Sequence, residues 1–290
     1  MKPQQISRRQ PRLSLPLVLA ALLLTMLVSS CELFQPAQTD KFGYRTGDYT
    51  VYDAVELDTS NNPTPKTYRV SRSVVRTGVT LGGQSDAILV RDSTFTSGAS
   101  PRIASVDTLY YRVANDEVFY YFDINAVGRI IRRIASSFGA TVDVSTLGIM
   151  GLEPKWIKIA ELRDAAGMDF PSADFSASAM VPMFGSLSVG LKVTGKNQGV
   201  VTQAVGSNSY RAHRQAQSYA ISTAIPLAGT LRSSASLETD YGIPAQQNTP
   251  RTIIRLQENT VVLGNIPIIG RITAPGERRT ISSFRAGTTF

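Results

Sequence analysis

The chain has 290 residues, one cysteine and a formal net charge of +8, from 30 lysines and arginines against 22 acids. Four of the cations lie in the first twelve residues, where there is no acid, so the rest of the chain carries 26 cations against 22 acids, or +4. A residual charge this small argues against nucleic-acid binding, which needs a clustered basic face. Charged residues make up only 18% of the chain, and the abundance of small, hydroxylated and glycine residues favours strands and turns over helices.

Residues 1–30 show the three regions of a secretory signal peptide. A positive start without acids is followed by an apolar run from Leu13 to Val28, and then by Ser29 and Ser30. These are the n-region, the h-region and the small residues that precede a cleavage site. The apolar run is shorter than the ~20 residues that a membrane-spanning helix needs, so a cleaved leader is favoured over an uncleaved anchor helix.

The lone cysteine, Cys31, follows the leader directly. The segment "VSSC" (28–31) resembles the lipobox of bacterial lipoproteins. The resemblance implies cleavage between Ser30 and Cys31, with acyl chains on the sulfur and on the new α-amino group, so that the membrane is the first partner. Stable anchoring takes two or more acyl chains. In lipoproteins of this type an Asp after the cysteine favours inner-membrane retention, so Glu32 favours the outer membrane.

A short tether, residues 31–47, separates the acylated cysteine from a β-rich globular domain at 48–290. Apolar residues alternate along 48–57 and are predicted to share one strand face: Tyr49, Val51, Val55 and Leu57. Turn residues at 58–66, 81–85 and 114–117 separate further predicted strands at 67–77, 87–95, 103–113 and 118–122. In 103–113, Leu109, Tyr111 and Val113 fall on one face. This spacing predicts an antiparallel meander.

One amphipathic helix is predicted near 124–138. Asp123 can cap its start and Gly139 can end it. An apolar stripe that includes Ile124, Val127 and Ile130 lies opposite a basic side that includes Arg129. The pattern favours packing of the stripe on the sheet with the arginines in water over a helix that lies on anionic lipid.

The second half repeats the strand signature. In 185–195, Leu187, Val189, Leu191 and Val193 alternate, whereas 155–162 is ambiguous between a strand and a short helix. Because strands occur on both sides of the helix, two lobes split near 139–155 stay an alternative to one domain. The predicted fold class is mainly β (α+β), an antiparallel curved sheet or half-barrel meander with one helix.

The search for chemistry yields no catalytic, cofactor or metal site. The single histidine, His213, is predicted to be solvent-exposed beside Arg211, with no marked nucleophile or orienting acid. One histidine and one acylated cysteine cannot form a His/Cys metal site. Neither a phosphate-binding glycine loop nor a Gly-x-Ser-x-Gly elbow occurs. No cofactor is therefore expected, and the protein is predicted not to be an enzyme.

Two apolar stretches, 180–185 and 265–270, look like loops. Met180, Met183 and Phe184 could line a cleft for a lipid or another apolar ligand, although burial in the core is the commoner use of such residues.

The order of leader, lipobox, tether and meander resembles uncharacterised bacterial cell-envelope lipoproteins. More distantly, by element order only, it resembles the lipoprotein-carrier half-barrels, in which a sheet and helix enclose an apolar cavity. The leading hypothesis is a lipid-anchored, non-enzymatic protein that binds a ligand or partner. The alternatives are a structural or assembly role in the envelope and a hydrolase that uses two carboxylates.

Overall fold

The computed structural model describes residues 42–98, 100–129, 152–181, 185–225, 229–244, 250–266 and 270–287. The chain divides into two compact units, 1–40 and 41–290, and every described residue lies in the second. The predicted signal peptide, Cys31 and most of the tether therefore lie outside the described residues. The same holds for the predicted helical residues 130–138 and for most of the predicted lobe boundary.

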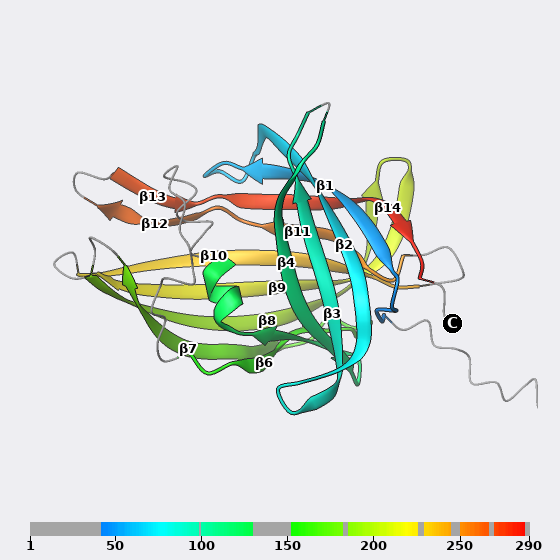
Figure 1. Ribbon diagram of the computed structural model, residues 1–290, viewed down its shortest axis with the longest axis horizontal. Coiled ribbons are helices and arrows are strands. Elements are labelled where there is room, and N and C mark those ends of the chain that lie inside the picture. The colour runs from blue at the N-terminus through cyan, green and yellow to red at the C-terminus, as the bar shows by residue number, and fades with distance from the viewer. Residues whose placement is uncertain are drawn as a thin grey trace, which may run out of the picture. The chain divides into compact units, whose positions relative to one another are not determined.

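The described residues form fourteen strands (Figure 1). The first six are β1 (Tyr49–Leu57), β2 (Pro63–Leu81), β3 (Gln84–Phe95), β4 (Ile103–Ala114), β5 (Glu117–Phe122) and β6 (Lys155–Glu161). The next four are β7 (Asp169–Val181), β8 (Gly185–Val205), β9 (Asn208–Ile225) and β10 (Gly229–Gly242). The last four are β11 (Ile253–Glu258), β12 (Val261–Ile266), β13 (Gly270–Ala274) and β14 (Gly276–Arg285). The mainly antiparallel β fold is thus confirmed, and the ambiguous segment at 155–162 contains a strand.

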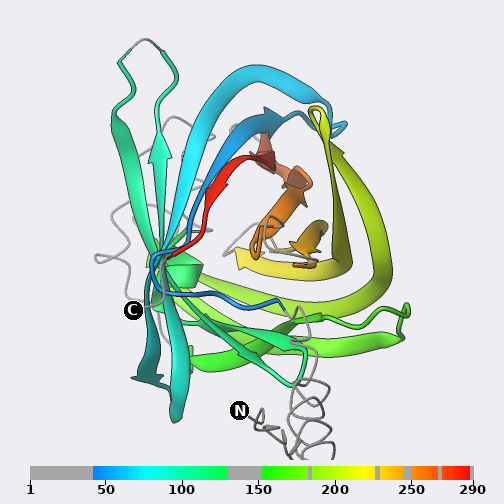
Figure 2. The ribbon, with the colours of Figure 1, turned by 90° about the vertical axis from the view of Figure 1, so that its right-hand side faces the viewer.

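Twelve strands form one sheet in the order β6-β5-β4-β3-β2-β1-β14-β11-β10-β9-β8-β7, while β12 and β13 pair separately. Two meanders, β1–β6 and β7–β11, are joined by β14, which pairs with β1 on one side and β11 on the other. The strands β2–β4 run at a steep angle to β8–β10, and the sheet curls round on itself (Figures 1 and 2). The curl brings the two edge strands together, so that the Ser172 hydroxyl of β7 donates to the Lys158 carbonyl of β6. The result is a nearly closed barrel.

The predicted turns at 81–85 and 114–117 form, whereas the predicted loop at 58–66 is too long: β2 already begins at Pro63, since proline is tolerated as the first residue of a strand. Asn115 and Asp116 both have positive φ, 54° and 62°, as the two-residue hairpin between β4 and β5 requires. Gly82 and Gly83, with φ of 54° and 77°, turn the chain between β2 and β3. At Gly82 a Cβ atom would lie 2.6 Å from the Tyr121 ring, so this turn needs glycine for space as well as for conformation.

Alternation predicts some strand faces correctly and not others. In β4, Leu109 and Tyr111 are buried as predicted. In β1, Leu57 is buried as predicted, but over the first part of the strand the predicted face is wrong, because Tyr52 and Ala54 are buried whereas Val51 is only half-buried. Tyr52 and Ala54 are buried because they pack against side chains of distant strands, including Ala212 and Ile254. The irregular pairing with β2 between Val55 and Leu57 then brings Leu57 to the buried face.

The predicted helix begins where expected, and its described part covers 124–129. The Asp123 carboxylate accepts a hydrogen bond from the Ala126 amide at 3.0 Å, which confirms the N-cap. The predicted apolar stripe is confirmed at Val127, which packs against the core beside Phe122, and wrong at Ile124, which is 45% exposed while Ala126 is buried. Arg129 donates to the Tyr120 hydroxyl instead of facing water. Since the helix starts directly after β5, the strand end sets which side of its first turn meets the sheet.

Buried side chains occupy the interior in three clusters. The first joins the N-terminal segment to both halves of the sheet through Phe42, Tyr44, Tyr111 and Tyr241. The second packs the hairpin of β8 and β9 against β1, β2 and β14, and includes Tyr52, Val70, Ala212, Ile254 and Ile281. The third lies under the helix and includes Phe122, Ile157, Leu191 and Val193. Side chains of these clusters therefore pack between the two halves of the sheet.

Candidate functional site

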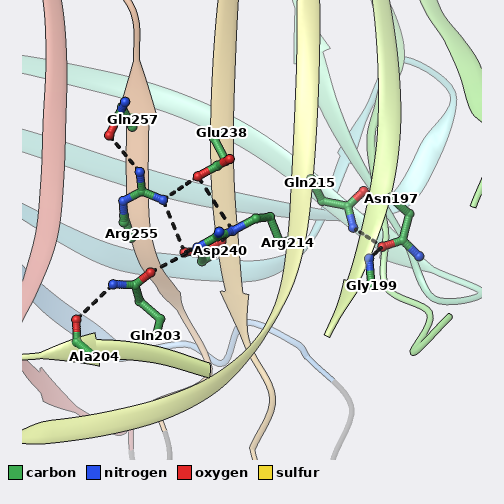
Figure 3. Close-up of polar contacts among 10 residues, drawn as sticks. All are labelled: Asn197, Gly199, Gln203, Ala204, Arg214, Gln215, Glu238, Asp240, Arg255 and Gln257. Carbon is green, nitrogen blue, oxygen red and sulfur yellow. Dashed lines mark hydrogen bonds and ion pairs between the residues drawn. The ribbon is translucent and has the colours of Figure 1, made fainter. Parts of the chain in front are cut away.

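The most deeply buried amide side chains lie on β8 and β9, on the face turned towards β6 (Figure 3). Gln215 is 1% exposed, and its side-chain amide pairs with the main chain of Glu161 in both directions. Its Nε2 donates to the Glu161 carbonyl at 2.7 Å, and its Oε1 accepts from the Glu161 amide at 3.1 Å. Gln217 adds a bond from Nε2 to the Ile159 carbonyl at 3.1 Å. The side chains thus supply bonds that a neighbouring strand would otherwise make.

Asn197 extends this arrangement beyond the end of β6. Its Nδ2 donates to the carbonyls of Arg163 and Ala165 at 3.0 and 2.9 Å. Its Oδ1 accepts from the Gly199 amide at 2.9 Å and from Gln215 Nε2 at 3.1 Å. Gly199 has φ of 84°, and a Cβ there would lie 3.1 Å from the Asp164 carbonyl, so glycine allows the close approach.

We refer to Asn197, Gln215 and Gln217 as the amide clasp. Because β6 is an edge strand, one of its sides has no ladder partner, and buried main-chain groups without partners are costly. Each member of the amide clasp binds main-chain atoms of 159–165, so its role in the fold is to close the barrel. The sequence signal for it is the pair of glutamines two residues apart, which share one strand face.

His213 lies beside the amide clasp, and the prediction that it is solvent-exposed is wrong. The side chain is buried because β9 carries it towards the segment that follows β6, where Nδ1 lies 3.2 Å from the Arg163 carbonyl. Burial lowers the pKa of His213, against weaker opposing effects of that hydrogen bond and of Asp164. Arg211, on the same strand, remains exposed. The contact is with main chain and not with a nucleophile.

The opposite face of β9 and β10 carries a network of ion pairs (Figure 3). Arg214 binds Asp240 in a bidentate manner, at 2.7 and 2.9 Å, and Asp240 is fully buried. Arg255 of β11 pairs with Glu238 and donates to Gln257 at 2.7 Å. The hydrogen bond with Asp240 raises the pKa of Arg214. Each carboxylate here is held by a guanidinium, which does not suit it to proton transfer.

A second ionic cluster lies across β2, β3 and β14. Arg72 donates to both oxygens of Asp92 at 2.8 Å, and Arg279 adds a bond to Asp92 at 3.2 Å. Arg279 also pairs with Glu277 at 2.6 Å. Burial raises the pKa of Asp92, but the two guanidinium groups outweigh it and the pKa is lowered. A general acid would need the opposite shift.

One open groove of about 300 Å³ lies on β7–β10, and a second of about 410 Å³ lies on β6–β8. The first is lined by Asp174, Gly190, Leu191, Lys192, Ala220, Ile221, Ser222, Arg232 and Ser233. The second is lined by Lys155, Trp156, Pro171, Ser172, Ala173, Asp174, Lys192, Val193 and Thr194. The sequence patterns did not single out these residues, because their proximity depends on cross-strand pairing.

The predicted apolar lining, Met180, Met183 and Phe184, cannot be placed relative to either groove from the described residues. Met180 lies in β7, while Met183 and Phe184 lie outside the described residues, so their ligand role stays a prediction. Among the described residues no group of three or more His, Cys, Asp or Glu side chains is arranged to hold a metal ion. Within the same residues, no helix has the length and apolar character needed to cross a membrane.

Comparison with known proteins leaves the family open. No protein-family model and no curated protein matches the chain. Among solved structures, a protein of Parabacteroides distasonis described as a lipoprotein is similar, with 12% identity and a TM-score of 0.44 over 84% of this chain and 97% of that one. A protein of Bacteroides fragilis, described as exported and with a YmcC-like fold, has 7% identity and a TM-score of 0.44 over 84% and 98%. Function therefore has to be argued from the leader and the geometry.

Proposed function

We propose that this chain is a lipoprotein of the bacterial cell envelope, anchored through acyl chains on Cys31, whose β-rich unit binds a ligand or partner without catalysis. The observation that carries the anchor is the leader that ends in "VSSC" at 28–31. Two or more acyl chains at one residue hold a protein stably on a membrane, at about 0.8 kcal/mol per buried methylene. Glu32 supports the outer membrane as the location.

The geometry supports binding on the outside of the barrel. The interior is occupied by the three apolar clusters and the amide clasp, whereas the two grooves open on the exposed face. Asp92 and Asp240 are buried and paired with arginines, which supports a structural role for them over a catalytic one. A ligand or partner would therefore meet the outer surface of β6–β10.

The anchor is tested by Cys31→Ser in the full chain. The expected result is an unprocessed precursor without fatty acids by mass spectrometry, and its loss from the detergent phase. Ser30→Ala keeps a small residue before the cysteine and should be processed and acylated normally. Acylated protein from Cys31→Ser, or an unmodified thiol in the natural protein, would refute the anchor. Density-gradient separation of the two membranes tests the outer-membrane assignment.

A structural or assembly role in the envelope is the second candidate, favoured by the filled interior. It predicts a protein partner in place of a small ligand. Cross-linking of the acylated protein in intact cells would reveal such a partner. An apolar ligand at Met180 and its neighbours predicts lipid that co-purifies with the mature protein in native mass spectrometry.

A further inference from the structure

The groove on β7–β10 and the groove on β6–β8 are neighbours, because Asp174 and Lys192 line both. We call the two adjoining grooves the joined groove. Its lining contains three cations, Lys155, Lys192 and Arg232, against one carboxylate, Asp174. The joined groove is therefore cationic, although the unit as a whole carries only a small positive charge.

Cross-strand pairing sets the separation of the cations. Lys192 pairs with Ala220, and Arg232 pairs with Ser222, so the two cations lie two strands apart and one side-chain row apart. With strands about 4.8 Å apart and rows about 7 Å apart, their Cα atoms are separated by about 12 Å. Charges at this separation suit successive groups of one extended ligand better than a single small anion.

The floor between these cations is made of small residues. Gly190 pairs with Ser222 across β8 and β9. A Cβ atom at position 190 would lie 2.5 Å from Ser222 Oγ, so a side chain there would displace the serine or fill the hollow. Ser222 adds a hydroxyl group on this face, whereas Ser233 pairs with Ile221 and its side chain points to the other face of the sheet. This part of the groove is therefore formed by Gly190 and Ser222, with Lys192 and Arg232 beside them.

The cations of the joined groove differ from those elsewhere on this face of the sheet. Arg214 and Arg255 are neutralised by Asp240 and Glu238. Lys192 and Arg232 are exposed. Asp174 is the cross-strand partner of Lys192, but among the described residues no carboxylate lies within 4 Å of the charged group of either cation. Lys155 donates to the Asp174 carbonyl at 3.2 Å, which leaves its charge without a carboxylate. These charges are available to an anionic ligand.

We propose that the joined groove binds a linear acidic polysaccharide, which deepens the proposed binding function and rests on it. Carboxylates of such a polymer would pair with Lys192 and Arg232, and one of its hydroxyls would bond with the Ser222 side chain between them. The groove is open, so a long chain can pass through it. A lipid bilayer fits this surface less well, because a flat membrane would contact the projecting side chains and would not reach the residues at the bottom of the groove.

The test uses residues 31–290 with Cys31→Ser, which removes the anchor, so its outcome is separate from that of the acylation experiment. Binding of polygalacturonate oligomers is measured by calorimetry, with neutral dextran oligomers for comparison. Lys192→Glu combined with Arg232→Glu should weaken polygalacturonate binding about tenfold or more. The control combines Arg76→Glu with Arg102→Glu, two exposed arginines on other strands or loops with the same change in net charge, and should change affinity less than twofold.

Groove filling gives a second measurement that does not alter charge. Gly190→Val should also weaken polygalacturonate binding about tenfold, with Val75→Ala, at an exposed position, as a silent control; circular dichroism checks that each variant is folded. Equal loss in both charge-reversal variants would show bulk charge alone and would overturn the proposal. Equal binding of dextran, no binding of polygalacturonate, or binding of phosphatidylglycerol vesicles through Lys192 and Arg232 in its place would overturn it as well.

Discussion

Replacing Gln215 with methionine should weaken the contact between β9 and β6 that closes the barrel. Methionine keeps the length of the side chain but removes its amide, so the bonds with the Glu161 carbonyl, the Glu161 amide and Asn197 are lost. At about 0.5–1.5 kcal/mol for each bond, three bonds correspond to about 3 kcal/mol of unfolding free energy. The matched control is Gln198→Met, an exposed glutamine on the same hairpin, which should cost less than about 0.5 kcal/mol.

Two assays distinguish local separation of β6 from β9 from a loss of stability throughout the protein. In guanidinium chloride, a loss of about 3 kcal/mol at a slope of about 4 kcal/mol/M lowers the unfolding midpoint by about 0.7 M. Native-state hydrogen exchange at the Glu161 amide should become about a hundredfold faster, because this amide exchanges when β6 separates locally from β9. The reasoning fails if Gln215→Met is no less stable than Gln198→Met, or if exchange at Glu161 is unchanged.

Three further predictions concern individual side chains. Burial lowers the pKa of His213, so as the pH falls the unfolded chain binds a proton before the folded chain does. The free energy of unfolding should therefore decrease as the pH drops below about 6.5. His213→Gln should reduce this pH dependence, measured by thermal unfolding at several pH values. Asp123→Ala should cost about 1 kcal/mol through loss of the helix cap, read by thermal unfolding. Asp92→Asn should lower the free energy of unfolding by about 3–5 kcal/mol, because it leaves the buried Arg72 charge poorly paired. Asp53→Asn, in an exposed ion pair, should lower it by less than about 1 kcal/mol. Similar losses in the two variants would refute this prediction.

Sequence patterns predicted this protein well wherever neighbouring residues decide the structure. The glycines at 82–83 and the Asn115–Asp116 pair turn the chain as predicted, because positive φ is a property of the residue itself. Asp123 caps the helix because its carboxylate reaches the amide three residues later. The regular alternation in β4 also placed Leu109 and Tyr111 correctly.

The same patterns failed where distant strands decide the outcome. The buried face of β1 depends on packing against side chains of β2, β9, β11 and β14, and β14 lies more than 200 residues along the chain. His213 is buried because the segment after β6 covers it. Alternation along a single strand contains no information about such partners.

The candidate site shows this division most clearly. The leader and the lone Cys31 are a local pattern, and the sequence alone supports the proposed anchor. The joined groove exists only because pairing of β8, β9 and β10 places Lys192, Ser222 and Arg232 on one face. Likewise, Gln215 has a role only because the curled sheet brings β6 to β9. Turns, caps and a leader follow from covalent neighbours, whereas closure and grooves depend on contacts that form only when the whole sheet has folded.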